Sequence, residues 1–422
     1  MILTIGISVL FLFIGVPIFI VFTILGEVLL GIHLEIPMEA IAQGMYNSIA
    51  KYILIAVPLF ILSGNLMLAG GLSRRLVDLF TCYVGHFKGG LALALVLTMG
   101  FFGALCGSIL AAIVAVGSIM IPMMVERGYP KPFCAALVAA SAGLDALIPP
   151  SNGAIIYCAI TGASVSKAFM AGLTPGIFQM VLLVAGSMWL CRKMQPAPRR
   201  SWRERGRATR DALPVLSMPI IILGGIYLGI FTPVEAAAIA CVWPIVVGIA
   251  IYRELTLKGI WVALKRTGSA TGVVFALIAT ASFLSLAFTY TGLPQNLVEI
   301  LTASGLTPIL LLFLSSVVWL ILGLFLEAVP NMFISVPIIM TLAEALGIDL
   351  LHLYLVQGAF ISVGLLTPPV SIGAYTAAAV ADVDVRDVMR YLYPVLFGIL
   401  ILCGLTYIFF PGIGLWLPRM MT

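Results

Sequence analysis

The chain has 422 residues, of which 62% are hydrophobic and only 9% are charged. A soluble globular domain carries about 25% charged residues, so this composition excludes a water-soluble protein and predicts an integral membrane protein. The formal net charge is +5, but the main basic run lies between apolar segments. We therefore expect it to face the membrane surface, with no nucleic acid as a partner.

Residues 1–30 form one apolar stretch in which Glu27 is the only charged side chain. A membrane-spanning helix needs about 20 apolar residues, and this stretch begins without the basic residues that open a cleaved signal peptide. We expect it to remain as the first membrane helix. Similar windows recur to the C-terminus, so the whole chain is predicted to be one multi-pass domain in the lipid bilayer.

A hairpin and a broken helix are predicted next. Residues 89–127 are apolar and interrupted by glycines, which favours a re-entrant helical hairpin. Such irregular backbone is tolerated at membrane depth only where protein or a water-filled cavity surrounds it. Residues 131–160 are predicted to form a helix broken at Pro149 and Pro150, because proline removes a backbone donor and forces its predecessor out of the helical region.

Residues 196–210 are predicted to be a basic loop. The polar segment from Arg192 to Arg210 holds eight basic residues and one acid, Glu204. Cytoplasmic loops of membrane proteins carry an excess of Lys and Arg, so we expect this loop to be cytoplasmic.

Two short patterns follow the basic loop. Thr232-Pro233-Val234-Glu235 has the form of a capping box with proline at the first helical position. Glu235 is therefore predicted to start a helix rather than to bind a ligand. Residues 252–266 combine four basic side chains with Trp261 and Leu264, which predicts an amphipathic helix lying at the interface.

The second half of the chain repeats the pattern of the first. A hairpin is predicted at 306–346 and a broken helix at 351–381, with its break at Pro368-Pro369. The markers repeat in one order: Leu147–Ser151 matches Leu366–Val370, Gly128 matches Gly347 (both 219 residues apart), and Gly71–Leu79 matches Gly292–Ile300 (221 apart). The chain is thus predicted to be two related halves, 1–195 and 211–422. Duplicated, usually inverted halves with broken helices are typical of secondary transporters.

The two Pro-Pro breaks have a direct chemical consequence. Each unwinds a helix and frees backbone carbonyls, which together with the hydroxyls of Ser151, Thr367 and Ser371 are hard oxygen ligands suited to Na⁺. The half-helix that restarts after each break presents its positive dipole end, which suits a carboxylate. A single proline would favour a simple packing kink, whereas the duplicated pair favours a binding role.

Asp145 and Glu327 are expected to lie at matching depth in the membrane beside the breaks. An acid at the bilayer centre costs about 2.5–3.5 kcal/mol on insertion scales, so a role is expected for both. Three roles are open: holding a cation, polarising the pocket, or capping exposed backbone N–H groups.

The remaining motifs exclude several functions. The seven cysteines are scattered without a CxxC pair, so we expect no transition metal and no disulfide framework. The chain contains no HExxH, GxSxG or GxGD motif, which argues against an enzyme, and no nucleotide-binding loop, so ATP is not expected to drive it. We expect no cofactor, and Na⁺ alone as the coupling ion.

Several motifs together resemble one transporter family. They are Gly103–Tyr129 with Gly107-Ser108 and Ile121-Pro122, Ile148-Pro149-Pro150-Ser151, Phe231–Ala238, and Gly364–Pro369. In this combination the chain resembles the large membrane (M) subunit of tripartite ATP-independent periplasmic (TRAP) transporters. The resemblance implies an elevator-type, sodium-coupled importer of organic acids in the bacterial inner membrane. It also implies two partners, a small membrane (Q) subunit and a periplasmic substrate-binding (P) protein.

The resemblance also implies a sodium site at each hairpin tip. The first would use Ser108 with backbone around Asp145, Leu147, Ile148 and Pro149, extended at this break by Pro150 and Ser151. The second would use Gly323 with backbone around Gly364, Thr367 and Pro368. The chemistry of the break itself adds Pro369 and Ser371 as candidate sodium- or substrate-binding residues, and Glu327 is a further candidate whose role is open.

Two positions depart from the family pattern, which usually has serine where this chain has Cys106 and glycine where it has Asp145. A thiol is a poor sodium ligand. The extra carboxylate could replace the lost oxygen or repel an acidic substrate. The alternative function is a stand-alone sodium/carboxylate symporter of related architecture, which would not copurify with a small membrane protein.

Overall fold

The computed structural model describes residues 11, 14, 16–34, 36–292, 295, 298, 299, 305–368 and 371–420. This described part is built from helices and contains no strand. Seven of its helices are long and apolar enough to cross a membrane. The prediction of an all-α, multi-pass membrane protein is therefore confirmed.

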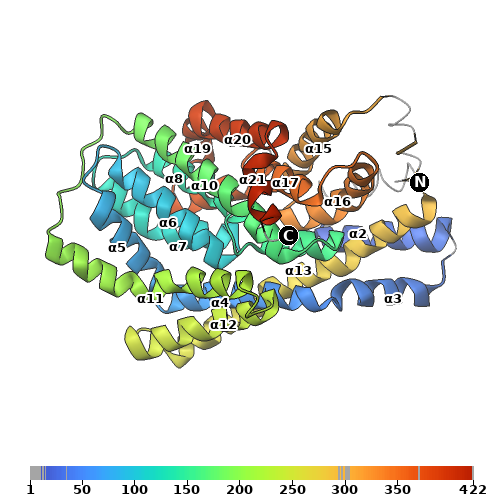
Figure 1. The fold of residues 1–422 in the computed structure, drawn as a ribbon, viewed down its shortest axis with the longest axis horizontal. Helices are drawn as coiled ribbons and strands as arrows, with labels where there is room; N and C mark the ends of the chain where they lie inside the picture. Colours follow the sequence, from blue (N-terminus) through green and yellow to red (C-terminus); the bar gives the residue numbers. More distant parts are fainter. Residues whose placement is uncertain are drawn as a thin grey trace.

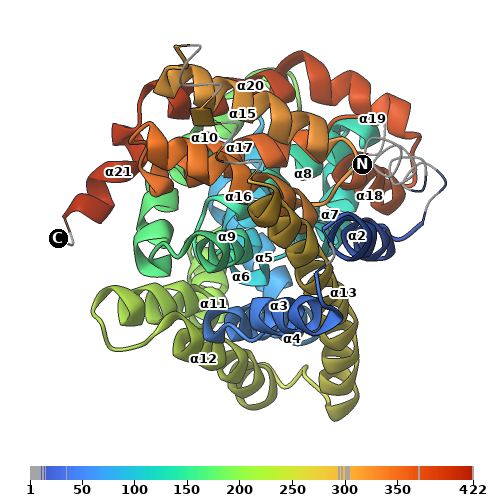
Figure 2. The same ribbon diagram turned by 90° about the vertical axis from the view of Figure 1, so that its right-hand side faces the viewer.

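One side of the molecule carries α3 (Met38–Ile49), α4 (Ala56–Ala69), α11 (Trp202–Tyr227) and α12 (Pro233–Val246), and α13 (Leu257–Thr291) crosses from them toward the other helices (Figure 2). We call these helices, together with α2 (Ile18–Glu27) on α13, the outer layer. Helix α4 packs against α12 and α13, while α2 and α3 pack along α13. Short irregular helices extend three of them: Val28–His33 after α2, Tyr52–Ile55 before α4 and Val247–Ile251 after α12.

The capping box predicted for α12 is confirmed. The Thr232 hydroxyl accepts a hydrogen bond from the Glu235 N–H at 3.3 Å, and the Glu235 carboxylate accepts one from the Thr232 N–H at 2.8 Å. Glu235 therefore serves the start of a helix, as its position in the motif indicates.

Two predictions about polar segments are wrong in extent. The loop predicted over 196–210 ends at Ser201, because Ser201 and Glu204 form a second capping box that starts α11 at Trp202. The amphipathic helix predicted over 252–266 begins only at Leu257, after its cap residue Thr256. It continues into α13, a single helix of 35 residues that contains no proline to end it.

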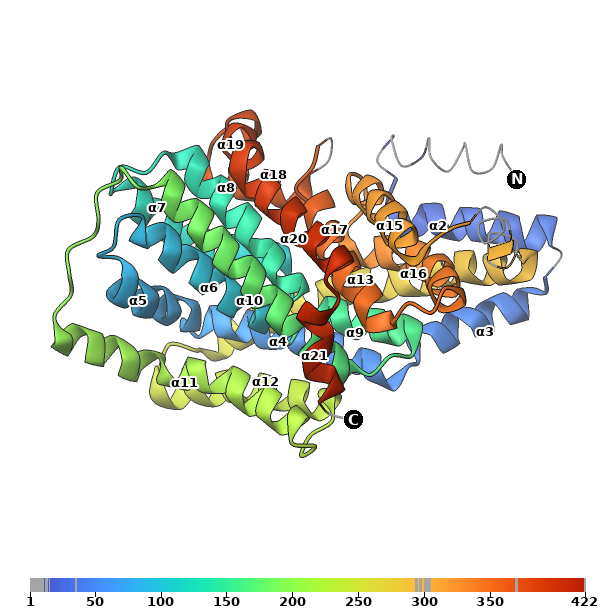
Figure 3. The ribbon, with the colours of Figure 1, turned by 45° about the horizontal axis from the view of Figure 1, so that its top comes forward.

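The inner body contains two series of helices, joined to the outer layer through α5 (Leu72–Val84), which packs on α6 and α11. The first series is α6 (Gly90–Cys106), α7 (Ile109–Val125), α8 (Lys131–Ala142), η3 (Gly143–Ala146), α9 (Asn152–Thr161) and α10 (Val165–Leu190). The second is α15 (Pro308–Gly323), α16 (Ala328–Ala345), α17 (Leu350–Gly364), α18 (Ile372–Ala381), α19 (Val385–Tyr391), η5 (Leu392–Phe397), α20 (Gly398–Phe409) and α21 (Gly412–Arg419). Figures 1 and 3 show α6, α7, α8 and α10 packed side by side and α15 beside α17.

The two series follow the same order of helices and breaks. Gly128 after α7 and Gly347 after α16 both have positive φ angles, of 83° and 68°, a region that favours glycine. Ser362 contacts Gly143, with a hydrogen bond of 3.4 Å from the Ser362 hydroxyl to the Gly143 carbonyl. These two residues are 219 positions apart, which is the predicted repeat offset. Most of the stretch 292–300 used in the alignment lies outside the described residues, and duplication, inversion and re-entry stay predictions.

Candidate functional site

The hairpin formed by α15 and α16 rests directly on the second helix break. A Cβ added to Gly323 would lie 2.7 Å from the Gly364 Cα, and one added to Gly364 would lie 2.8 Å from the Gly323 Cα. Only two glycines permit this approach of one backbone to another. The two residues predicted to share a sodium site are therefore in contact.

The tip of the first hairpin, between α6 and α7, rests on the first break. Gly107 has a φ of 59°, and its carbonyl accepts a hydrogen bond of 2.8 Å from the Asn152 side-chain amide at the start of α9. Ser108 caps α7, since its hydroxyl accepts a hydrogen bond from the Ala111 N–H at 3.4 Å. Gly103 lies one turn before Gly107 and leaves room for Asp145. A Cβ added to Gly103 would lie 3.4 Å from the Asp145 Cβ.

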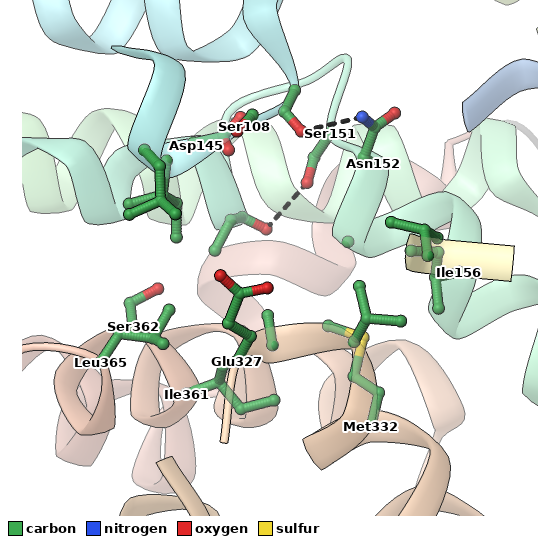
Figure 4. A pocket seen from close by; sticks show the side chains of 18 of the residues that line it. Ser108, Asp145, Ser151, Asn152, Ile156, Glu327, Met332, Ile361, Ser362 and Leu365 are labelled. Carbon is green, nitrogen blue, oxygen red and sulfur yellow. Dashed lines mark hydrogen bonds between the residues drawn. The ribbon is translucent and has the colours of Figure 1, made fainter. Parts of the chain in front are cut away.

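A cavity of about 350 Å³ lies between the first break, the second hairpin and the outer layer. One wall carries Ser108, Asp145, Ser151 and Asn152, and the facing wall carries Glu327, Met332 and Ser362 (Figure 4). The outer layer contributes Val57 and Ile61 from α4 and Ala270, Val273 and Val274 from α13. The lining is mostly apolar with a few polar groups, which is typical of small-molecule sites.

Four helices begin at this cavity. Its lining includes the first two residues of each: Ile109 and Leu110 of α7, Asn152 and Gly153 of α9, Ala328 and Val329 of α16, and Ile372 and Gly373 of α18. Each helix start has backbone N–H groups without a partner in its own helix and a positive dipole end. The backbone around the cavity therefore favours an anionic group.

Two carboxylic acids line the same cavity. Asp145 is 6% exposed, and its Oδ1 atom has no hydrogen-bond partner among the described residues. Glu327 precedes α16 and makes no side-chain cap there, and its carboxylate extends into the space between the two walls (Figure 4). Glu327 makes no side-chain cap at α16, and the Asp145 Oδ1 atom has no partner among the described residues, so the geometry does not support the capping role.

The other residues predicted at the first break face away from the cavity. The Leu147 carbonyl and the Ile148 side chain pack against Gly172 and Gly176 of α10, and neither they nor Pro149 and Pro150 line the cavity. The Ala146 carbonyl accepts hydrogen bonds from the Ser151 hydroxyl at 3.4 Å and the Tyr354 hydroxyl at 2.8 Å. This break is therefore held by both series of helices.

The second break offers free hydroxyl oxygens. The Thr367 hydroxyl donates to the Val363 carbonyl at 2.8 Å and keeps its lone pairs. Ser371 is buried, has a φ of 38°, and its Oγ atom has no partner among the described residues. Pro368 is exposed, and Pro369 lies outside the described residues.

Sequence reasoning missed Asn152, Ser362 and the five lining residues of the outer layer. Asn152 directly follows the predicted Ser151, and an amide inside an apolar segment was a usable signal. Ser362 lies inside the continuous helix α17. A serine there does not interrupt the apolar pattern, so the sequence gives little indication that it lines a site. The outer-layer residues are ordinary Val, Ile and Ala, which the sequence alone does not distinguish from lipid-facing ones.

The comparison with known families decides what kind of protein this is. The family described as the tripartite ATP-independent periplasmic transporter, DctM component, matches residues 5–413. The chain belongs to this family. It is accordingly a TRAP transporter large permease and not an enzyme.

Individual relatives agree with that assignment. The C4-dicarboxylate TRAP transporter large permease protein DctM of Pseudomonas aeruginosa is 38% identical to this permease over 385 residues, 90% of each chain. The isethionate TRAP transporter permease protein DctMQ of Oleidesulfovibrio alaskensis is 34% identical over 93% of this permease, which spans 62% of that relative. The solved YdaH transporter of Alcanivorax borkumensis shares the fold, with a TM-score of 0.63 at 17% identity over 89% of this chain and 88% of its own.

Proposed function

We propose that this permease is the large subunit of a sodium-coupled importer in the bacterial inner membrane, and that it carries an organic acid delivered by a periplasmic binding protein. The observation that carries the proposal is the convergence of four helix N-termini on one largely apolar cavity. Helix N-termini bind carboxylates through their unpaired N–H groups and positive dipole ends. The organic acids named for the two relatives are of the same chemical kind.

Sodium coupling is supported mainly by the second break. The hydroxyl oxygens of Thr367 and Ser371 lie in the segment that contains the break, and the Gly323–Gly364 contact brings the hairpin tip against it. Hydroxyl and backbone carbonyl oxygens are hard ligands of the kind Na⁺ takes. At the first tip the Ser108 hydroxyl and neighbouring carbonyls fit the same ion, but Cys106 offers only a thiol.

An elevator movement and two partner proteins complete the proposal. The cavity has walls from both the inner body and the outer layer, so sliding of the inner body along α4 and α13 would carry the substrate from one membrane face to the other. A small membrane subunit would hold the outer layer in place, in keeping with the DctMQ name of the longer relative.

Uptake into proteoliposomes tests this function. The permease is reconstituted with its small subunit, the binding protein and the compound that the binding protein retains. We expect uptake under an inward sodium gradient and little under an equal potassium gradient. Equal uptake under both gradients would refute sodium coupling. Full uptake without the small subunit and the binding protein would instead favour the stand-alone symporter.

A further inference from the structure

The charged side chains that line the cavity are all acidic. Asp145 and Glu327 are the charged members of the lining, and none of the described lining residues is Lys, Arg or His. A substrate with two or more negative charges would therefore meet two carboxylates and no basic side chain. The described lining therefore offers no charge-assisted bond from Arg or Lys, the side chains that most often recognise dianions.

Asp145 in particular lacks a hydrogen-bond partner among the described residues. It is 6% exposed, and its buried Oδ1 atom accepts no hydrogen bond from the described residues. A buried carboxylate without a hydrogen bond or counter-charge is strongly unfavourable. Because the side chain borders the cavity, a bound molecule can supply the missing donor.

Glu327 approaches the same space from the other series of helices. Its carboxylate projects from the wall opposite Asp145 (Figure 4), and its own helix does not use it as a cap. Two carboxylates on facing walls of a cavity of about 350 Å³ suit a small organic molecule, since such pockets start at roughly 300 Å³. The space is much larger than a bare ion needs.

We propose that the substrate is an organic acid that also carries an ammonium group. The ammonium donates to Asp145 and Glu327, and the carboxylate lies at the helix starts of α7, α9, α16 and α18. Each end of such a zwitterion then meets a group of opposite charge within one cavity. This inference rests on the proposed transport function and specifies the substrate class of the same site.

Ligand-dependent thermal unfolding of the purified permease with its small subunit tests the substrate class. The probes are β-alanine, butanoate and succinate, which share a –CH2CH2COO− unit and differ in the group at its other end: ammonium, methyl and carboxylate. We expect β-alanine to raise the unfolding temperature of the wild type most and succinate least. Asp145→Asn and Glu327→Gln should each weaken the apparent affinity for β-alanine about tenfold or more, since hydrogen bonds to charged groups are the strong ones.

Asp382→Asn is the matched control. Asp382 is an exposed acid outside the cavity, and its left-handed φ of 50° suits asparagine equally well. This variant should keep the wild-type order of probes. A wild type that prefers succinate, or that responds equally to all three probes or to none, would overturn the substrate class, as would a β-alanine response that survives both cavity substitutions.

The same samples are also titrated with sodium in the absence of any probe, with potassium replacing sodium so that the ionic strength stays constant. This titration separates the inferred substrate class from the proposed sodium coupling. Sodium stabilisation without a β-alanine preference would overturn the substrate class alone. A β-alanine preference without any response to sodium would overturn sodium coupling and leave the substrate class standing.

Discussion

Single hydroxyl and thiol groups distinguish the two helix breaks. At the second break the Ser371 hydroxyl has no partner among the described residues, whereas at the first break the Ser151 hydroxyl donates to the Ala146 carbonyl and Cys106 offers only a thiol. We therefore expect the second break to be the better sodium site.

Thr367→Val tests the second site at the scale of one atom. It removes a hydroxyl ligand while nearly keeping the side-chain shape. We expect the sodium concentration for half-maximal transport to rise about tenfold, the effect of losing one strong polar contact to an ion. A sodium titration of proteoliposome uptake measures it.

Thr376→Val provides the control for Thr367→Val. The Thr376 hydroxyl makes the same kind of bond, 2.8 Å to the Ile372 carbonyl, but it lies inside α18. Its sodium response should match the wild type. If Thr367→Val matches the wild type as well, Thr367 is not a sodium ligand.

At the scale of elements, the hairpins depend on glycine contacts with the breaks. Gly323 and Gly364 pack backbone against backbone, and Gly107 accommodates the Asn152 side chain. Longer side chains at these positions would separate the hairpin tips from the breaks, because the neighbouring atoms are backbone or are themselves held by hydrogen bonds.

Gly323→Ala should therefore destabilise the permease by about 1–3 kcal/mol, the usual cost of overpacking. Thermal unfolding in detergent with the small subunit measures the change. Gly224→Ala in α11 is the control, because a Cβ there meets nothing within 4 Å, and alanine in an open helical position stabilises by about 0.5–1 kcal/mol. Equal unfolding temperatures for the two variants would contradict close packing at the tip.

At the scale of the whole molecule, the basic segment predicts the orientation in the membrane. The segment between α10 and α11 and the first turns of α11 hold the eight basic residues, so the positive-inside rule places them in the cytoplasm. Since α11 is long enough to cross the membrane, the turn after Tyr227 should lie on the periplasmic side.

Cysteine labelling tests this orientation. Gln195→Cys, in the segment between α10 and α11, and Leu228→Cys, directly after α11, are exposed positions. They are made in a Cys82→Ser background, because the other six native cysteines are buried. In intact cells an impermeant thiol reagent should label Cys at 228 rapidly and at 195 only after permeabilisation. The reverse pattern would invert the proposed topology.

The sequence by itself determined the features that depend on local chemistry. Hydropathy predicts the membrane class because lipid admits few charges, the capping box predicts the start of α12, and prolines and glycines predict where helices break. Where such local signals conflicted, the prediction failed: the basic charge of 202–210 suggested a loop, although the capping box at Ser201 starts a helix there.

Only the tertiary structure decided which of these local features come together. The approach of Gly323 to Gly364, the bond from Asn152 to the Gly107 carbonyl and the bond from Lys51 to the Ala159 carbonyl join segments 41 to 108 residues apart. The cavity arises in the same way, since α4, α7, α9, α13, α16 and α18 each contribute a few lining residues. Such contacts follow from how whole helices pack, and packing depends on the shapes of many side chains at once rather than on any one motif.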